Sequence, residues 1–541
     1  MSDSIRRIGA KALKDQLHDG QEIALLDARE EVPFDARHLF SASCVPLSRM
    51  EMLLHDMVPR RSTRVVWCDD GAGLAERAAA RMVALGYTDV SVLEGGIAAW
   101  EQAGYRLYNG VHVPSKAFAE VVEHEAGTPW ISAEELKTMI DRRENIVILD
   151  SRSYEEYHSN SIPGAISVPG AELVYRFTDL VPSPDTTVIV NCGGRTRSII
   201  GAQSLLNAGF PNKIVSLKNG TQAWHLAGYE VVDGATRRPP EVSAAGLTAA
   251  QQAAARVAAR CGVVTLDKAT LATWRAEAGQ RTLYVLDVRT PEEYAAGHVP
   301  EALSAPGGQL IQETDNYLAT WGARVVLLDD NGVRATMTAS WLQQMGWTEV
   351  AIMRIDDVGG SLVQGPHLPQ ALGLETVKVS TIDAPALQQA LAAGTAQVLD
   401  LDWSRQYYRG HIPGAWFAIR ARLQEALRVV PPTEMLVLTS PDALLARLAA
   451  ADLAGQVSMP VKVLAGGTEA WRRAGLPLEQ GRTRMANAAD DIRLRAREQE
   501  KNREEAMREY LTWEIELVNQ MATEDEHHFH VMSAGGAARQ A

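Results

Sequence analysis

Residues 188–198, with the sequence VIVNCGGRTRS, hold the residue types that nucleophilic chemistry needs. An apolar strand ends just before Cys192, and Gly193 and Gly194 let the backbone curl tightly enough for several N–H groups to point inward. Such a nest of amides binds an anion. A helix that starts near Ser198 adds its positive N-terminal end at the same point. This stretch therefore predicts an anion-binding loop with a cysteine at its start.

Two arginines in this loop, Arg195 and Arg197, add full positive charges. Together with the inward amides they favour the thiolate over the thiol, so we expect a lowered pKa for Cys192. The thiolate is the nucleophile, which makes Cys192 the candidate catalytic residue. The alternative is an inert core cysteine beside two solvated arginines, and it gives no reason for two glycines and two arginines so close to one strand end.

The other three cysteines stand in different surroundings. Cys68 is followed by Asp69 and Asp70 and by no arginine in its turn, so its pKa should be raised and anions repelled. We expect Cys68 to be weak or inactive, an auxiliary group at most. Cys44 and Cys261 are predicted to be packing residues. Four cysteines without a C-x-x-C form neither a disulfide framework nor a zinc pattern, so we expect no metal and a reducing, cytoplasmic setting.

The loop belongs to a unit that occurs four times in the chain. Each copy opens with an apolar strand that ends in an aspartate, and a second apolar strand leads into a turn 40 to 42 residues after that aspartate. Asp150 is followed two residues later by Arg152, and this pair is expected either to form a structural ion pair behind the loop or to assist the site. The opening aspartates are Asp27, Asp150, Asp287 and Asp400, and the first turn residues are Cys68, Cys192, Asp329 and Ser440.

Short apolar strands that alternate with amphipathic helices predict an α/β fold with parallel sheets. In such sheets a ligand site lies beyond the carboxyl ends of the strands, which is where all four turns fall. The sequence thus predicts four tandem domains, each a small parallel sheet flanked by helices, and a charged C-terminal helix. The predicted segments are residues 1–107, 128–232, 263–372 and 373–480 for the four domains and 481–541 for the charged helix and tail.

Length and composition limit the function further. At ~150 residues per domain, 541 residues suggest three to four domains, and 46% apolar with 22% charged residues is an ordinary globular balance. A net charge of −14 argues against nucleic-acid binding. The apolar runs fall far short of the ~20 residues of a membrane helix, and the N-terminal residues lack the apolar core of a signal peptide. We therefore expect neither a nucleic acid nor a membrane as partner.

The C-terminal segment has a different pattern. Residues 485–523 are dense in charge and predict a long exposed helix that is a candidate for packing on another domain. The tail from His527 onward is predicted to be disordered, and its histidines are not expected to form a metal site.

Four features of the repeated unit resemble rhodanese domains: the Asp-x-Arg strand end, a Gly-His-Ile-Pro-Gly-Ala-type segment, the cysteine loop and a Gly-Gly-x-x-x-Trp segment. The resemblance covers residues 5–107, 128–232, 263–372 and 380–480. It implies a small α/β domain repeated four times and sulfurtransferase chemistry through a persulfide on Cys192, with no metal or organic cofactor. The loop residues that match the family's anion-cradling positions are Gly193, Gly194, Arg195, Thr196, Arg197 and Ser198.

The resemblance also implies a reaction in two steps. The Cys192 thiolate attacks the sulfane sulfur of a small anionic donor such as thiosulfate, and sulfite leaves. Arg195 and Arg197 would hold the donor and stabilise the departing charge. A thiol, cyanide or a protein acceptor then takes the sulfur and regenerates Cys192.

The other copies depart from this pattern. Asp329 and Ser440 replace the nucleophile, and neither a carboxylate nor an unassisted hydroxyl can carry a persulfide, so domains 3 and 4 are predicted to be inactive. Two other functions stay open: a non-enzymatic persulfide relay or scaffold that serves a partner protein, and a rhodanese-fold phosphatase or arsenate reductase. Four residues separate Cys192 from Arg197 where the phosphatase loop has five, so the smaller cradle favours sulfur.

Overall fold

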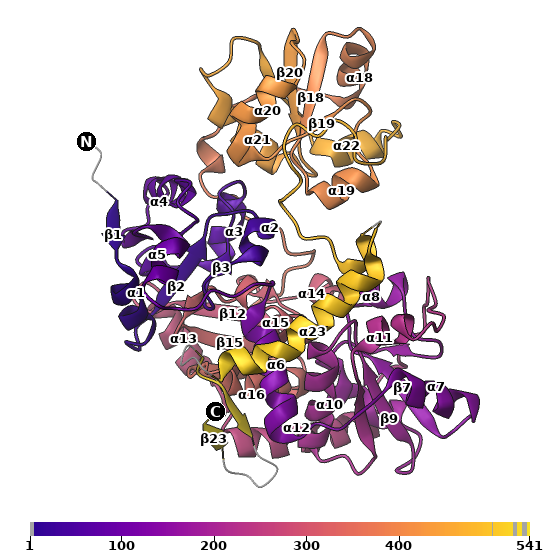
Figure 1. Cartoon of the computed structure of the whole chain (residues 1–541). Helices are drawn as coiled ribbons and strands as arrows, with labels where there is room; N and C mark the ends of the chain where they lie inside the picture. The colour runs from indigo at the N-terminus through magenta and orange to yellow at the C-terminus, as the bar shows by residue number, and fades with distance from the viewer. Residues whose placement is uncertain (1–4, 500, 523–526, 533–537, 541) are drawn as a thin grey trace. The chain divides into compact units, whose positions relative to one another are not determined.

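The computed structural model describes residues 5–499, 501–522, 527–532 and 538–540 (Figure 1). They form four parallel sheets flanked by helices, which confirms the predicted α/β fold with a repeated domain. In all four sheets the strands of the repeat follow one spatial order: first, fifth, fourth, second, third. The chain divides into two compact units, residues 1–15, 25–111 and 369–495 in one and residues 16–24, 112–368 and 496–541 in the other.

One unit is built mainly from the first and fourth domains. The first domain has strands β1 (Arg6–Ile8), β5 (Val90–Leu93), β4 (Val65–Cys68), β2 (Ile23–Asp27) and β3 (Ser43–Cys44), and helices α1 (Ala10–Leu17), α2 (Glu31–Ala36), α3 (Met50–Met57), α4 (Leu74–Ala84) and α5 (Gly96–Gln102). The fourth domain has strands β17 (Ser380–Ile382), β21 (Val461–Leu464), β20 (Met435–Thr439), β18 (Ala396–Asp400) and β19 (Trp416–Phe417), and helices α18 (Ala384–Ala392), α19 (Ser404–Arg409), α20 (Leu423–Val429), α21 (Leu444–Leu453) and α22 (Gly467–Arg473).

The other unit holds the second and third domains and the C-terminal helix. The second domain has strands β6 (Trp130–Ile131), β10 (Ile214–Leu217), β9 (Thr187–Asn191), β7 (Ile146–Asp150) and β8 (Ile166–Ser167), and helices α7 (Ala133–Asp141), α8 (Tyr154–Ser159), α9 (Glu172–Leu180), α10 (Thr196–Ala208) and α11 (Gly220–Leu226). The third has strands β11 (Val264–Thr265), β16 (Val350–Arg354), β15 (Arg324–Asp329), β12 (Leu283–Asp287) and β13 (Leu303–Ser304), and helices α13 (Lys268–Ala276), α14 (Pro291–Ala296), α15 (Gly307–Gln312), α16 (Val333–Gln344) and α17 (Ile355–Val358). Outside these sets lie α6 (Val113–Ala126), α12 (Ala244–Cys261), β14 (Thr320–Trp321), α23 (Arg503–Met521), β22 (His530–Met532) and β23 (Ala538–Gln540).

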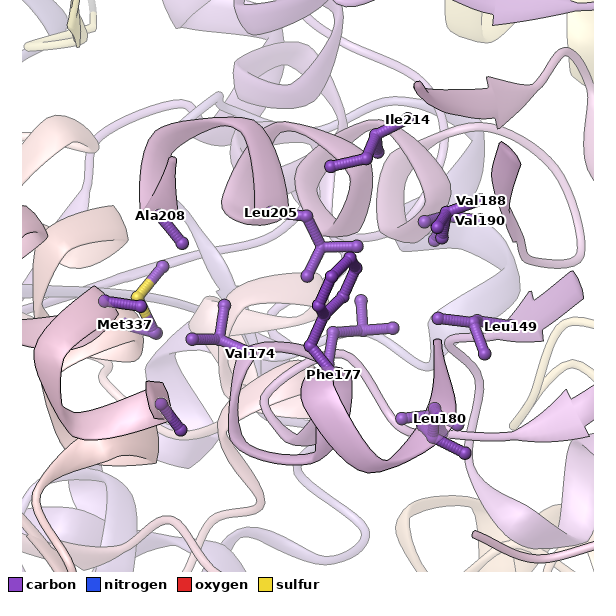
Figure 2. Packing of buried hydrophobic residues seen from close by; sticks show 14 of the residues in the cluster. Leu149, Val174, Phe177, Leu180, Val188, Val190, Leu205, Ala208, Ile214 and Met337 are labelled. Atoms are coloured by element: carbon purple, nitrogen blue, oxygen red, sulfur yellow. The ribbon is translucent and has the colours of Figure 1, made fainter. Parts of the chain in front are cut away.

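The strands of the second domain are buried on both faces, as continuous apolar sequence predicts. On one face, side chains of the sheet such as Leu149 and Val190 pack against Phe177 of α9 and Leu205 of α10 (Figure 2). Met337, from α16 of the third domain, is part of the same cluster. One core therefore extends over both domains of this unit, and it fixes the end of β9 and the start of α10, where the cysteine loop lies.

The second and third domains exchange equivalent contacts. Arg197 and Arg334 both stand 47 residues after their strand-end aspartates, and Glu172 and Gln309 both stand 22 residues after them. Arg197 donates a hydrogen bond to Gln309 across the boundary at 2.9 Å, and Arg334 donates to Glu172 in the opposite direction at 2.8 Å. This reciprocity indicates that the two domains pack around an approximate two-fold axis.

The predicted C-terminal helix is present but shorter than residues 485–523, since α23 covers Arg503–Met521. The first part of that prediction was wrong, because residues before the helix pack in irregular conformation on the fourth domain. Asn487 accepts a hydrogen bond from the Ile419 amide at 2.9 Å, and Asp491 accepts one from the Ser404 amide at 2.7 Å. High charge density alone does not set a helical period. Residue 523 lies outside the described residues.

The prediction of a disordered tail was wrong for the part of the tail that the structure describes. β22 pairs with β23 in an antiparallel ladder, and Phe529 and Val531 are buried. These two apolar residues alternate with His528 and His530, which is the period of a strand, and the histidine-rich composition hid it. Residues 523–526, 533–537 and 541 lie outside the described part of the chain.

No helix within the described residues is both long and apolar enough to cross a lipid bilayer.

Arg334 is the residue on which this domain packing can be tested. Its side chain is fully buried and pairs with Glu172, Glu293 and Asp330. We expect R334A to lower the free energy of opening of α9 and α16 by about 1 to 3 kcal/mol, because it removes a fully buried guanidinium from the buried Glu172 carboxylate, which then keeps only Arg176. Native-state hydrogen exchange measures this opening. The control R275A removes the half-exposed pair with Glu301 and should cost less than about 1 kcal/mol. Equal effects of the two variants would contradict the interpretation.

Candidate active site

Cys192 stands between the last residue of β9 and the loop that leads into α10. Its side chain is 2% exposed. The thiol donates a hydrogen bond to the Ser198 hydroxyl at 3.5 Å, and that hydroxyl in turn donates to the Arg195 carbonyl at 2.8 Å. The sulfur therefore lies inside the curl of the loop, on the side of the first turn of α10, where the helix dipole favours negative charge.

The start of α11 holds the loop from the other side. The Thr221 amide and hydroxyl both donate to the Cys192 carbonyl, at 2.8 and 3.0 Å, and the Gln222 amide donates to the Gly193 carbonyl at 3.2 Å. A methyl group placed on Gly220, which has φ +55°, would stand 2.3 Å from the Cys192 carbonyl oxygen. The segment that begins at Gly220 thus positions the Cys192 loop by close backbone approach.

Behind the loop, Asp150 and Arg152 form a buried ion pair with an oxygen–nitrogen distance of 2.7 Å. Arg152 also donates to the carbonyl and the side chain of Asn160, at 2.6 and 3.0 Å. A methyl group on Gly193 would lie 3.7 Å from the Arg152 side chain, so the arginine stem packs under the loop. The Asp150–Arg152 ion pair therefore supports the cysteine loop through the packed Arg152 side chain.

Both loop arginines are bound to carboxylates, although the sequence suggests that they hold an anionic donor. Arg195 is 3% exposed and donates to both oxygens of Glu120, at 2.6 and 2.7 Å, and also pairs with Glu123. Arg197 donates to Glu156 at 2.5 and 3.0 Å. Glu120 and Glu123 come from α6, a segment with no motif of its own, so no pattern in the sequence could reveal these partners.

The pKa of Cys192 is shifted in the direction opposite to the prediction. Burial raises it above that of an ordinary thiol, while the positive charge of Arg197 and hydrogen bonds from the Ser198 side chain and backbone lower it. The nearby carboxylate of Glu514 raises it further. The expectation of a lowered pKa was wrong because it counted the charges and left out the loss of water around a 2% exposed sulfur.

In the other three domains, a side-chain oxygen of the loop itself accepts hydrogen bonds from backbone amides of the same turn. In the third domain the Asp329 carboxylate accepts from the amides of Gly332 and Ala335, at 2.7 and 3.1 Å. In the fourth, the Ser440 hydroxyl accepts from the Ala446 amide at 3.3 Å. These loops hold an oxygen acceptor where the second domain has sulfur.

The first domain combines a cysteine with an internal anion. The Asp69 carboxylate accepts from the amides of Gly71, Leu74 and Ala75, at 2.8, 2.7 and 3.1 Å. Burial raises the pKa of Cys68 well above that of an ordinary thiol, and Asp27 raises it further. The amides that would bind a substrate anion are therefore already occupied beside Cys68.

One further residue reaches the Cys192 loop from the distant C-terminal helix. The Thr196 hydroxyl donates to Glu514 of α23 at 3.3 Å. A residue 318 positions away carries no spacing signal, and sequence reasoning missed it. Within the described residues, no group of three or more His, Cys, Asp or Glu side chains is arranged to hold a metal ion.

Three segments of the chain, residues 9–103, 132–227 and 269–354, match the family model of the rhodanese-like domain. The chain belongs to the rhodanese family.

Among solved structures, the chain is similar to a thiosulfate sulfurtransferase from Pseudomonas aeruginosa, with 47% identity, a TM-score of 0.93, and coverage of 97% of this chain and 100% of the other. This likeness supports the assignment of the protein as a sulfurtransferase. Among curated proteins, it is 31% identical over 102 residues to "Putative sulfur carrier protein YrkF" of Bacillus subtilis, covering 19% of this chain and 54% of that protein. It is 36% identical over 96 residues to "Probable adenylyltransferase/sulfurtransferase MoeZ" of Mycobacterium tuberculosis, covering 17% and 24%. The chain thus spans about half or less of the length of these curated relatives.

The approach of Gly220 to Cys192 gives a matched pair of variants. We expect G220A to lower sulfur-transfer activity by at least about 100-fold, because the added methyl must displace the Cys192 carbonyl, which it would meet at 2.3 Å. G96A makes the same kind of clash with the Asp69 carbonyl in the first domain, at 2.4 Å, and should leave activity within about twofold. Steady-state assays on both folded variants measure this. Similar losses in both would show that the effect is not local to the Cys192 loop.

The raised pKa of Cys192 predicts its reactivity with an alkylating agent. Since only the thiolate reacts, the rate of Cys192 labelling in the native protein should keep rising above pH 8.5, the pKa of a free thiol being about 8.5. Cys68 should react more slowly still. Peptide mass spectrometry after timed iodoacetamide treatment measures both rates, with the urea-unfolded chain as reference. A plateau below pH 8 for Cys192 would contradict the assigned direction.

Proposed function

We propose that this protein is a sulfurtransferase that carries sulfane sulfur as a persulfide on Cys192. It moves the sulfur from thiosulfate or a similar anionic donor to a thiol, to cyanide or to a protein acceptor. The observation that carries the proposal is the position of the Cys192 sulfur inside the curl of the loop, at the start of α10 and within hydrogen-bond distance of Ser198.

The reaction that fits this geometry has two displacements at sulfur. The Cys192 thiolate attacks the outer sulfur of thiosulfate, a new S–S bond forms, and the old S–S bond breaks with its electron pair leaving on sulfite. An acceptor thiolate or cyanide then attacks the outer sulfur of the persulfide and releases the Cys192 thiolate. The Ser198 amide, whose hydrogen bond favours the Cys192 thiolate, stays beside that sulfur when it becomes the inner atom of the persulfide.

The arginines contribute less to donor binding than their charges suggest. Arg197 lowers the pKa of Cys192 through its charge, yet its guanidinium is shared with Glu156 and Gln309. Arg195 is enclosed by Glu120, Glu123 and Asn219. We therefore propose that the two arginines hold the loop in shape and offset nearby carboxylates, and that the loop Gly193–Ser198 binds the donor mainly through its backbone.

The proposal assigns catalysis to the second domain alone. The loops of domains 3 and 4 have no thiol, and the amides beside Cys68 are bonded to Asp69. A persulfide relay that serves a partner protein is a second candidate, because a 2% exposed sulfur admits small donors slowly.

Intact mass spectrometry after incubation with thiosulfate tests the proposal directly. We expect the wild-type chain to gain one sulfur atom, which cyanide then removes as thiocyanate. C192S should gain no sulfur and retain less than about 1% of the turnover, since a hydroxyl cannot carry the persulfide. C68S, the matched control, should load and turn over like the wild type.

Each other outcome has a defined meaning. Loading of C192S would move the carrier to another cysteine and contradict the proposal. Loading of Cys192 followed by slow release to cyanide would favour the relay. Absence of loading together with hydrolysis of an aryl phosphate that C192S abolishes would favour the phosphatase.

A further inference from the structure

Helix α23 carries one buried carboxylate, that of Glu514, in a row of buried apolar side chains. It packs against α6, and its buried residues are Met507, Leu511, Glu514, Leu517 and Met521 (Figure 1). The spacing of three or four residues is that of one helix face. Four of the five side chains are apolar, and an apolar residue in place of Glu514 would avoid burying a carboxylate. A glutamate at this position is therefore unexpected for packing alone.

The contacts of Glu514 lie at the Cys192 loop. Its side chain is 1% exposed, and its Oε1 accepts hydrogen bonds from the Tyr510 hydroxyl at 2.8 Å and the Thr196 hydroxyl at 3.3 Å. Its Oε2 has no hydrogen-bond partner among the described residues. A methyl group placed on Gly194 would stand 2.9 Å from that oxygen. An unsatisfied carboxyl oxygen thus faces the loop that surrounds Cys192.

The neighbouring charges do not neutralise Glu514 completely. Arg195 lowers the pKa of Glu514 but is already bonded to Glu120 and Glu123. The Lys116 ammonium also lowers it, and lies 5.3 Å from the centre of the Tyr510 ring and 5.0 Å from that of Trp513. Burial outweighs these charges and raises the pKa of Glu514.

We propose that Glu514 is a specificity-determining residue that selects sulfur donors by charge and disfavours the reaction of dianionic donors with Cys192. Ionised, its Oε2 repels a donor at the loop. Neutral, it carries its proton on Oε2, because Oε1 already accepts two hydrogen bonds, and it donates to an oxygen of the donor. The inference rests on the proposed function, since it concerns the donor that loads Cys192.

Two donors that differ by one charge can test this selection. Thiosulfate is a dianion, and an alkyl thiosulfonate is a monoanion that offers the same outer sulfur. With the first, the S–S bond breaks and sulfite leaves. With the second, the same bond breaks and a sulfinate leaves. Both form one persulfide, so the second step is common, and the ratio of their kcat/KM values (dianion over monoanion) cancels the ionisation of Cys192.

E514Q keeps the shape of the neutral carboxyl group and its hydrogen-bond donor but cannot ionise. We expect this variant to raise the ratio by roughly tenfold at the alkaline end of the pH series, where the ionised form of Glu514 is most populated, the effect of one unit charge at short range. The matched control is E516Q, which removes a charge from an exposed position on the same helix and should leave the ratio within twofold. Cyanide serves as acceptor throughout, and thiocyanate is measured.

The wild-type protein gives a second readout that does not depend on a variant. Raising the pH favours the ionised form of Glu514, so the ratio should fall as the pH rises in the wild type and fall less steeply in E514Q. The charged and titratable groups that interact with Glu514 are Tyr510, Lys116, Arg195, Glu120 and Cys192. Burial raises the pKa of Glu120 to about 7. All five groups stay in E514Q, so a slope caused by any of them would persist in that variant.

The outcomes separate this inference from the proposed function. A pH dependence of the ratio that is the same in the wild type and in E514Q, or a ratio that E514Q and E516Q shift equally, overturns the role of Glu514 while sulfur transfer stands. If neither donor loads Cys192 in any of the proteins, the sulfurtransferase proposal itself fails.

Discussion

Amides that point inward at a strand-to-helix turn need an acceptor, and this need organises all four domains. A buried N–H group without a partner costs about 1 to 3 kcal/mol. The third and fourth domains satisfy it with the first residue of the turn, a carboxylate at Asp329 and a hydroxyl at Ser440. The first domain uses Asp69, the residue after its cysteine. In the second domain the residue at this point is Cys192, whose sulfur bonds to Ser198. A loop filled by fixed oxygen leaves little room for a substrate anion, which supports the proposal that only the second domain carries out the chemistry.

The charges around Cys192 are balanced in pairs, and one of the paired arginines also takes part in the contact between the second and third domains. Arg197 bonds to Glu156 within its own domain and to Gln309 of the third, and Arg334 bonds to Glu293 and to Glu172 in the reciprocal arrangement. The loop that leads to Arg334 begins with Asp329 and contains no cysteine. An arginine at this position is thus explained by domain packing even where the loop has no cysteine, which weakens any argument for function from the arginine alone.

The sequence predicted the repeated α/β domain and the location of the loops, because apolar strands and the spacing from aspartate to turn are local properties. It did not predict the partners of the loop. Glu120 and Glu514 come from α6 and α23, which carry no motif, and only the fold brings them to Arg195 and Thr196. The direction of the Cys192 pKa was wrong for a related reason, because charges can be counted along a sequence while burial depends on the packing of elements that are distant in the chain. The tail was mispredicted because histidine composition hid a two-residue alternation around Phe529.

A buried thiol with a raised pKa and a role as sulfur carrier are compatible once the persulfide is considered. Burial disfavours the thiolate and slows the first attack, yet it also keeps water and unselected thiols away from the outer sulfur after loading. The Ser198 amide lies beside the Cys192 sulfur in both states, so its hydrogen bond favours the thiolate and remains next to the inner sulfur of the persulfide. A site of this kind gains protection of its intermediate and loses speed toward small donors. Its choice of donor then depends on the few groups that reach the loop, and among these the carboxyl group of Glu514 is held by Tyr510 and Thr196 with one oxygen toward Gly194.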